Sequence, residues 1–317
     1  MKLRTRILSL VALGLLARVP LQAAAPIEIK QQWMAGKKYY QTVQTDQQSS
    51  IEIGQQKMEQ TTSMIIELTM AVSPHRDGQP KRMIIRYERM AMEVGMNGQK
   101  MGYDSANPGA SGDPLNLSKT IGATVGQELK VVFNDKDEVD KVENYDEFIA
   151  HLSPAAVPGF DPAKMFSRES LTQMLKQGSL QGVPGKPVTS GDTWPFSNQV
   201  DLPQLGKVAV TGKYTLTGVG DHNGVPCAEI QTEGTLSMDL SAGTDNASPL
   251  NALGMKVTDG TIKGPVWFDP ALGIARESQL AQEMTISMKN PADPTATLTV
   301  PMKQQITVKL TKIEDLK

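Results

Sequence analysis

The sequence has few of the residues that build compact chemical sites. It contains one cysteine (Cys227), three histidines and 5% aromatic residues in a chain of 317. A single thiol excludes an intrachain disulfide, a cysteine-based zinc site and an iron–sulfur cluster. Basic residues number 32 and acidic residues 34. The near-zero net charge therefore gives no electrostatic footprint for nucleic acid, and we expect no nucleic-acid partner.

The sequence also lacks an apolar run long enough to span a membrane. Its longest candidate, at residues 7–17, has eleven residues, whereas a spanning helix needs about 20. Lys2, Arg4 and Arg6 precede this run, and three alanines end at Ala25. This layout is typical of a secretory signal peptide at residues 1–25, with cleavage between Ala23 and Pro26. An amphipathic N-terminal helix is the alternative, but the run shows no 3.6-residue alternation.

Signal removal has two expected consequences. No cysteine lies near the cleavage region, so we expect no lipid anchor and a mature protein that is periplasmic or secreted. Four basic residues and no acidic residue would be lost, which leaves 28 basic against 34 acidic residues and a net charge of −6.

Period-2 alternation dominates the rest of the chain. Apolar residues occupy most of the even-numbered positions in residues 62–72, 208–216, 228–240, 280–288 and 298–310. One apolar and one polar face per strand is typical of antiparallel sheets with one face in water. We therefore expect Met64, Ile66, Leu68 and Met70 to face an interior, and Glu67 and Thr69 to face water.

Turn residues separate these strands. Asn97-Gly98 is a strong signal for a type I′ hairpin, and further turns are expected at residues 135–137, 221–224 and 269–273. Helix signals are fewer. They predict a helix at about residues 145–151 after Asn144, a second from Asp161 to a stop at Gly178, and a single turn at residues 115–121.

We therefore predict a mainly β (α+β) fold of two curved antiparallel sheets with a short helical segment between them. Residues 26–145 form the first β half, residues 146–189 the helical middle and a Gly/Pro connector, and residues 190–317 the second β half. The similar turns at Phe133-Asn134-Asp135 and Phe268-Asp269-Pro270 indicate a duplication. The sequence leaves open whether the two sheets fuse into one.

Several short motifs, in this order, resemble those of a family of uncharacterised secreted bacterial proteins, known only as a domain of unknown function. The motifs are GKKYY at residues 36–40, GQQKM at 54–58, YDS at 103–105, VTSGDTW at 188–194 and YTL at 214–216. The resemblance implies a signal peptide and an antiparallel β architecture, and it transfers no activity and no functional residue. The layout is also loosely similar, at fold level, to the curved sheets of periplasmic lipoprotein carriers.

No motif predicts catalysis or a cofactor. His75, His151 and His222 lack metal-ligand spacing, and we expect all three to be exposed in loops or at a helix end. Residues 109–113 have the wrong order for a nucleophile elbow, and residues 182–187 lack the spacing of a phosphate loop. The acidic segment 134–140 lacks the glycine of a calcium loop and is interpreted as a turn.

Two sulfur-containing features need separate interpretation. Cys227 falls on the strand face of Glu229 and Gln231, without a basic neighbour in sequence, so a nucleophilic role is disfavoured. Methionine is abundant, with 17 residues, many of them on apolar strand faces. These methionines either fill an ordinary core or line an apolar surface for a lipid-like ligand.

We conclude from the sequence that no catalytic, cofactor-binding or metal-ligating residue can be assigned, and that no cofactor is predicted. The favoured function is non-catalytic binding of an apolar small molecule, a lipid or another envelope component outside the cytoplasm. The alternatives are a secreted hydrolase without a recognisable motif and a structural protein of the cell envelope. A deep pocket lined by the apolar strand faces would favour binding, and a converging His/Asp/Glu set would favour an enzyme.

Overall fold

The structure of the chain is a computed structural model. It describes residues 25–53, 56–74, 76, 78–109, 116–134, 137–152, 168, 171, 172, 175, 180, 182–202, 206–239, 256–290 and 293–316. All but the last residue of the expected signal peptide lies outside these residues, as does His75. None of the described helices has the length and apolarity that a membrane span requires.

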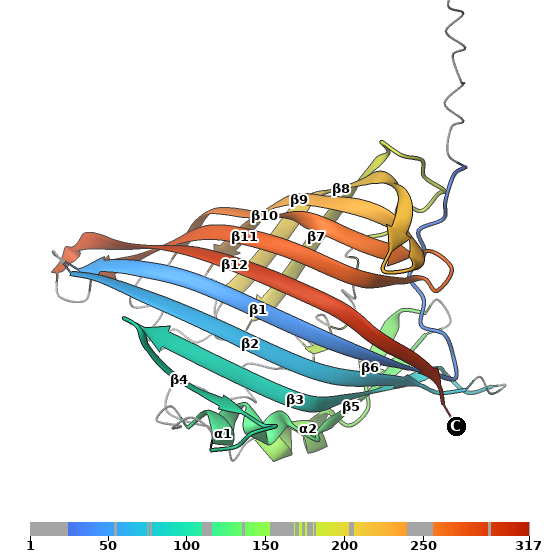
Figure 1. The fold of residues 1–317 in the computed structure, drawn as a ribbon, viewed down its shortest axis with the longest axis horizontal. Coiled ribbons are helices and arrows are strands. Elements are labelled where there is room, and N and C mark those ends of the chain that lie inside the picture. Colours follow the sequence, from blue (N-terminus) through green and yellow to red (C-terminus); the bar gives the residue numbers. More distant parts are fainter. Residues whose placement is uncertain are drawn as a thin grey trace, which may run out of the picture.

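Twelve strands of the described chain form one open antiparallel sheet (Figure 1). The first half contributes β1 (Lys37–Ile53), β2 (Gln56–Val72), β3 (Arg82–Met96), β4 (Gln99–Asp104), β5 (Glu128–Phe133) and β6 (Val139–Val142). The second half contributes β7 (Thr193–Leu202), β8 (Gly206–His222), β9 (Val225–Asp239), β10 (Lys256–Asp269), β11 (Ile274–Asn290) and β12 (Asp293–Asp315). The order is β6-β5-β3-β2-β1-β12-β11-β10-β9-β8-β7, and β4 pairs with β3.

The two halves meet where the first and last strands pair. β1 and β12 lie side by side in Figure 1, in register from Lys37 opposite Asp315 to Ser49 opposite Met302. The prediction of a mainly β, antiparallel fold is confirmed. The question that the sequence left open is answered by this pairing, because strands of both halves share one continuous sheet. The exact boundaries of the halves and their origin by duplication stay predictions.

Local signals predicted the connections well. Asn97 and Gly98 have φ angles of 48° and 84°, and Asn223 and Gly224 have 54° and 82°, as a type I′ hairpin requires. The expected helices appear as α1 (Leu117–Thr120), followed by the short 3₁₀ helix η1 (Gly122–Thr124), and as α2 (Tyr145–Leu152). The helix expected from Asp161 to Gly178 falls mostly outside the described residues.

The two faces of the sheet differ in charge. Cross-strand partners share a face, so the register places residues 39–49 (odd numbers) on one side with the even-numbered residues of 62–72, 278–288 and 298–310. None of these positions carries a charged side chain. We call this side the inner face and the opposite side the outer face. Lysines and glutamates such as Glu67, Glu277, Lys303 and Lys309 lie on the outer face.

One outer-face prediction was wrong. Thr69 was expected to face water, yet it is 4% exposed. A bulge in β3 places Glu67 opposite Arg89 and Leu68 opposite Tyr87, which leaves Glu88 as the extra residue. The Thr69 hydroxyl donates to Oε1 of Glu88 over 2.9 Å. The bulged residue thus covers Thr69 with a polar partner, which alternation alone could not predict.

Two apolar clusters lie at the two ends of the inner face. The first packs α2 against β5, β6 and the strands of the first half, and it includes Tyr39, Val131 and Phe148. The second lies on β7–β10 and includes Trp194, Leu216 and Phe268. The segment before β1 connects them, because Ile29 belongs to the second cluster and Trp33 packs against the first.

Candidate functional site

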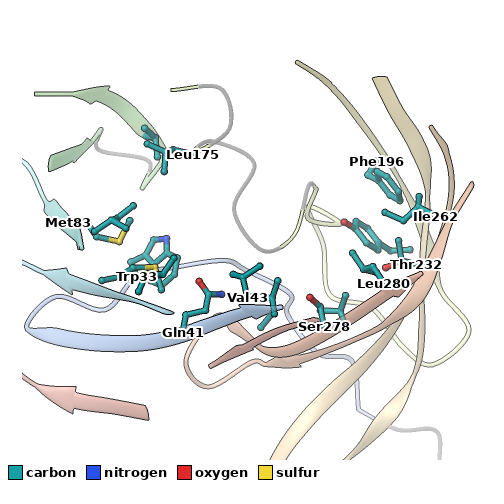
Figure 2. A pocket seen from close by; sticks show the side chains of 18 of the residues that line it. Trp33, Gln41, Val43, Met83, Leu175, Phe196, Thr232, Ile262, Ser278 and Leu280 are labelled. Carbon is teal, nitrogen blue, oxygen red and sulfur yellow. The ribbon is translucent and has the colours of Figure 1, made fainter. Parts of the chain in front are cut away.

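A cavity of 380 Å³ lies on the inner face between the two clusters. Figure 2 shows Met83 and Leu175 on one side of it, Phe196 and Ile262 on the other, and Gln41 and Val43 between them. Strands of both halves therefore line one space, which exists because β1 pairs with β12.

The lining of the cavity is apolar and uncharged. None of its described residues is Asp, Glu, Lys, Arg or His, and its polar members include Gln41, Thr232 and Ser278. Tyr87 also contributes a hydroxyl. Burial raises the pKa of this phenol above its ordinary value of 10.0, so Tyr87 is neutral at physiological pH. The described wall thus offers dispersion contacts and a few neutral hydrogen-bonding groups.

The second-half wall is shaped by two glycines. A Cβ atom on Gly212 would lie 2.7 Å from Cζ of Phe196, and one on Gly234 would lie 3.1 Å from the same atom. The Phe196 ring can therefore lie close to the sheet only because both positions lack a side chain. Tyr214 packs against Phe196 with ring centroids 4.6 Å apart. Two packed aromatic rings, Phe196 and Tyr214, thus form part of this wall.

The first-half wall depends on the segment before β1. Trp33 meets Tyr39 edge to face with centroids 5.1 Å apart, and the Tyr39 hydroxyl accepts a hydrogen bond from the Met34 amide at 3.0 Å. Gly273 lets the same segment approach the β10–β11 turn, because a Cβ there would lie 2.8 Å from the Lys30 carbonyl oxygen. The segment thus fixes Trp33 at the cavity.

The two described histidines, His151 and His222, lie in separate environments. His151 is exposed at the end of α2, as expected, with Nδ1 2.8 Å from the Glu147 carbonyl oxygen. His222 was expected to be exposed, and this prediction was wrong: its side chain is 17% exposed. The β8–β9 hairpin places the ring against Trp267, with centroids 4.3 Å apart, and 3.1 Å from Oε2 of Glu277.

The Glu277 carboxylate sits on the outer face, away from the cavity. Its burial favours the neutral form, but hydrogen bonds from Gln279 and His222 outweigh this and lower its pKa. Trp267 and Glu277 are cross-strand partners, whereas Val266 and Ser278 beside them line the cavity. The His222–Glu277 pair therefore packs the hairpin onto the sheet.

Cys227 is buried, at 1% exposure. Burial and the nearby Asp269 raise the pKa of its thiol, although Arg276 acts in the opposite direction. The sequence indicated no basic neighbour, and the fold brings one near without producing a thiolate. Cys227 belongs to neither wall of the cavity.

The acidic segment 134–140 and the glycine-rich segment 182–187 make contacts that stabilise the fold. Asn134 donates its amide to the Glu138 carbonyl at 2.9 Å, and Lys81 binds Asp137 over 2.6 Å, so these members of the acidic segment stabilise a turn. Gly182 accepts a hydrogen bond from Nε1 of Trp194 at 3.3 Å. Residues 110–115 and 135–136 lie outside the described residues. Within the described chain, no three His, Cys, Asp or Glu side chains are grouped as metal ligands.

The inner-face methionines fall into two groups. Met70 and Met83 are buried in the first cluster and also line the cavity. Met64, Met284, Met288 and Met302 continue along the inner face and remain partly exposed. Sequence reasoning missed Trp33, Gln41, Thr232 and Ser278 as lining residues. Gln41 and Ser278 lie on the uncharged face of their strands, and this position was a usable signal that they line the cavity.

Comparison with known proteins identifies a family whose function is unknown. The model of a family of unknown function (DUF6263) matches residues 78–275. None of the curated proteins matches the chain.

Similarity to solved structures is distant. The structure titled "Lipid-protein interactions in lipovitellin" has a TM-score of 0.47 and 8% identity, over 90% of this chain and 26% of that chain. The chain thus spans about a quarter of the lipovitellin chain. A DUF1329 family protein from Desulfovibrio piger has a TM-score of 0.18 and 7% identity, over 89% of this chain and 86% of that one. A putative outer membrane lipoprotein-sorting protein domain from Vibrio parahaemolyticus has a TM-score of 0.15 and 7% identity, over 86% and 85%.

Proposed function

The chain belongs to the DUF6263 family, whose function is unknown, and we propose that it is a non-catalytic protein that binds an apolar ligand on its inner face, outside the cytoplasm. The observation that supports this most strongly is the 380 Å³ cavity with its uncharged lining. Ligand pockets in proteins are typically about 300–1,000 Å³, mostly apolar, with a few placed polar groups. The cavity matches each of these properties.

The inner face beyond the cavity supports the same proposal. Partly exposed methionines continue from it along β2, β11 and β12, and no charged side chain interrupts them on the four central strands. Methionine is flexible and polarizable, so a methionine-rich surface adapts to apolar ligands of varied shape. An elongated hydrocarbon fits this surface better than a compact polar metabolite.

A matched pair of substitutions on β1 tests the site. Val43 lines the cavity, whereas its neighbour Thr42 points to the outer face. Val43→Phe should fill the cavity and weaken binding of the uncharged apolar dye Nile red by at least tenfold, and Thr42→Phe should leave it unchanged. Equal binding by both variants and the parent protein, measured by fluorescence titration, would rule out the cavity as the binding site.

The location is proposed from residues 1–25 alone. Their basic, apolar and small-residue regions support export through a cleaved signal peptide. N-terminal sequencing of the protein from fractionated cells should give a chain that starts between Ala24 and Pro26, in the periplasm or the medium. Recovery of the intact chain from the cytoplasm would contradict export and leave the binding proposal unaffected.

A further inference from the structure

Thr232 has a buried hydroxyl without a partner. The residue lies on β9, is 3% exposed and lines the cavity. Within the described chain, its Oγ1 is the buried side-chain atom for which no hydrogen-bond partner is found. Buried polar atoms are nearly always bonded, and leaving one unpaired costs about 1–3 kcal/mol. A ligand group that bonds to this hydroxyl would recover that cost.

The surrounding strands explain why the protein does not satisfy this hydroxyl itself. Thr232 is opposite Gly264 on β10 and opposite Tyr214 on β8. Gly264 offers no side chain, and a Cβ there would lie 1.9 Å from the Gln279 carbonyl oxygen. Threonine hydroxyls on the outer face do have hydrogen-bond partners. The Thr311 hydroxyl donates to the Tyr40 carbonyl at 3.1 Å, and the hydroxyl oxygens of Thr211 and Thr235 lie 3.2 Å apart. The unpaired hydroxyl belongs to the inner face.

The charge of the lining restricts what can bind there. Gln41, Ser278 and Thr232 are neutral, and no described lining residue is a cation. A carboxylate or phosphate brought into this cavity would lose its hydration without gaining an opposite charge, which is strongly unfavourable. An ester, amide or alcohol loses less and can bond to a hydroxyl.

We propose that the ligand is a neutral amphiphile, an ester or alcohol of a long hydrocarbon chain, whose polar group bonds to the Thr232 hydroxyl. This inference rests on the proposed apolar-ligand function and adds the chemical class of the ligand. In Figure 2 Thr232 and Ser278 lie on the second-half side of the cavity, with Gln41 nearer the first half. The polar group would therefore bind near β9, and the hydrocarbon chain would extend along the uncharged central strands.

The test compares two ligands of equal chain length, a monoacylglycerol and the corresponding fatty-acid anion, by displacement of Nile red at pH 8. The monoacylglycerol should bind at least tenfold more tightly than the anion. Thr232→Val, which keeps the shape and removes the hydroxyl, should weaken monoacylglycerol binding by about 3- to 10-fold. Thr232→Ser should retain it, and Thr235→Val on the outer face of the same strand should have no effect.

A thermal-unfolding measurement separates this account from loss of structure. Thr232→Val removes no hydrogen bond of the free protein, so its midpoint should equal or exceed that of the parent. Equal monoacylglycerol affinity of parent and Thr232→Val, or equal affinity for the ester and the anion, would overturn this inference and leave the cavity proposal standing. Absence of binding of both the dye and the lipids would overturn the proposed function and this inference with it.

Discussion

Two leucines on the inner face have different environments. Leu216 is 1% exposed within the second cluster, where it is packed on all sides. Leu68 is partly exposed, packs against the first cluster with one side and lines the cavity with the other. The same type of side chain is therefore packed core in one place and part of the cavity wall in the other.

Truncation of these two residues should separate the two roles. Leu216→Ala should lower the free energy of unfolding by about 2–5 kcal/mol, because it leaves a cavity in packed core. Leu68→Ala should cost less than about 2 kcal/mol, because open space already adjoins the side chain, but should weaken Nile red binding. Urea unfolding and dye titration of both variants measure this. A larger stability loss for Leu68→Ala, with dye binding intact, would place Leu68 in closed core.

Residue-level prediction from sequence was accurate where alternation decides the environment and wrong where a distant element covers the residue. Leu68 and Met70 lie on the predicted apolar face. Thr69 and His222 were predicted to be exposed, but a bulge covers one and a hairpin packs the other onto Trp267. Neither contact leaves a pattern within a few residues of the side chain concerned.

At the scale of elements, one arginine connects three strands. Arg89 on β3 donates to both carboxylate oxygens of Asp104, at the end of β4, over 3.0 and 2.8 Å, and to Glu67 on β2 over 2.8 Å. Asp104 also accepts the Ala106 amide at 2.9 Å. The YDS motif that the family resemblance singled out thus positions β4 against β3.

This contact should make stability depend on pH in a defined window. The bonds from Arg89 hold the pKa of Asp104 at about 2, below its ordinary value of 3.8. A lowered folded-state pKa stabilises the folded protein above the ordinary pKa, and this contribution disappears as the pH falls toward 2. Asp104→Asn should therefore cost about 1 kcal/mol at pH 7, and the difference from the parent should shrink between pH 4 and pH 2.

Urea midpoints of parent and variant across that pH range measure this effect. Glu93→Gln is the matched control, because Glu93 lies on β3, the strand of Arg89, and is an exposed carboxylate that pairs with Lys100 at the surface. It should change stability by no more than about 0.5 kcal/mol at any pH. A constant difference between parent and Asp104→Asn down to pH 2 would contradict the ionic origin of the effect.

Most elements were predictable because their signals are local. The hairpins at Asn97-Gly98 and Asn223-Gly224 follow from residues that tolerate positive φ, and α2 follows from a short amphipathic segment after Asn144. The pairing of β1 with β12 was not predictable, because it joins residues more than 250 positions apart and leaves no periodic trace. Since this pairing brings the two walls together, the candidate site could be predicted only as an apolar strand face.

At the scale of the molecule, the continuous sheet places its charges on one side and its methionines on the other. Over residues 39–49, 62–72, 278–288 and 298–310, the central strands β1, β2, β11 and β12 carry no charge on the inner face, while ion pairs such as Lys303–Glu283 and Lys312–Glu314 lie on their outer face. Large exposed apolar patches on proteins commonly mark binding sites, and this partly exposed face is of that kind. The account therefore depends on an apolar ligand reaching the inner face.

The chain has three tryptophans, and their positions allow a direct measurement. Trp33 lines the cavity, and Trp267 lies on the outer face against His222. Two single-tryptophan proteins share Trp194→Phe: one also carries Trp267→Phe and retains Trp33, and the other carries Trp33→Phe and retains Trp267. A monoacylglycerol with bromine on its acyl chain should quench the emission of Trp33 saturably and leave that of Trp267 unchanged. Equal quenching of both, or quenching of Trp267 alone, would contradict binding of the ligand on the inner face.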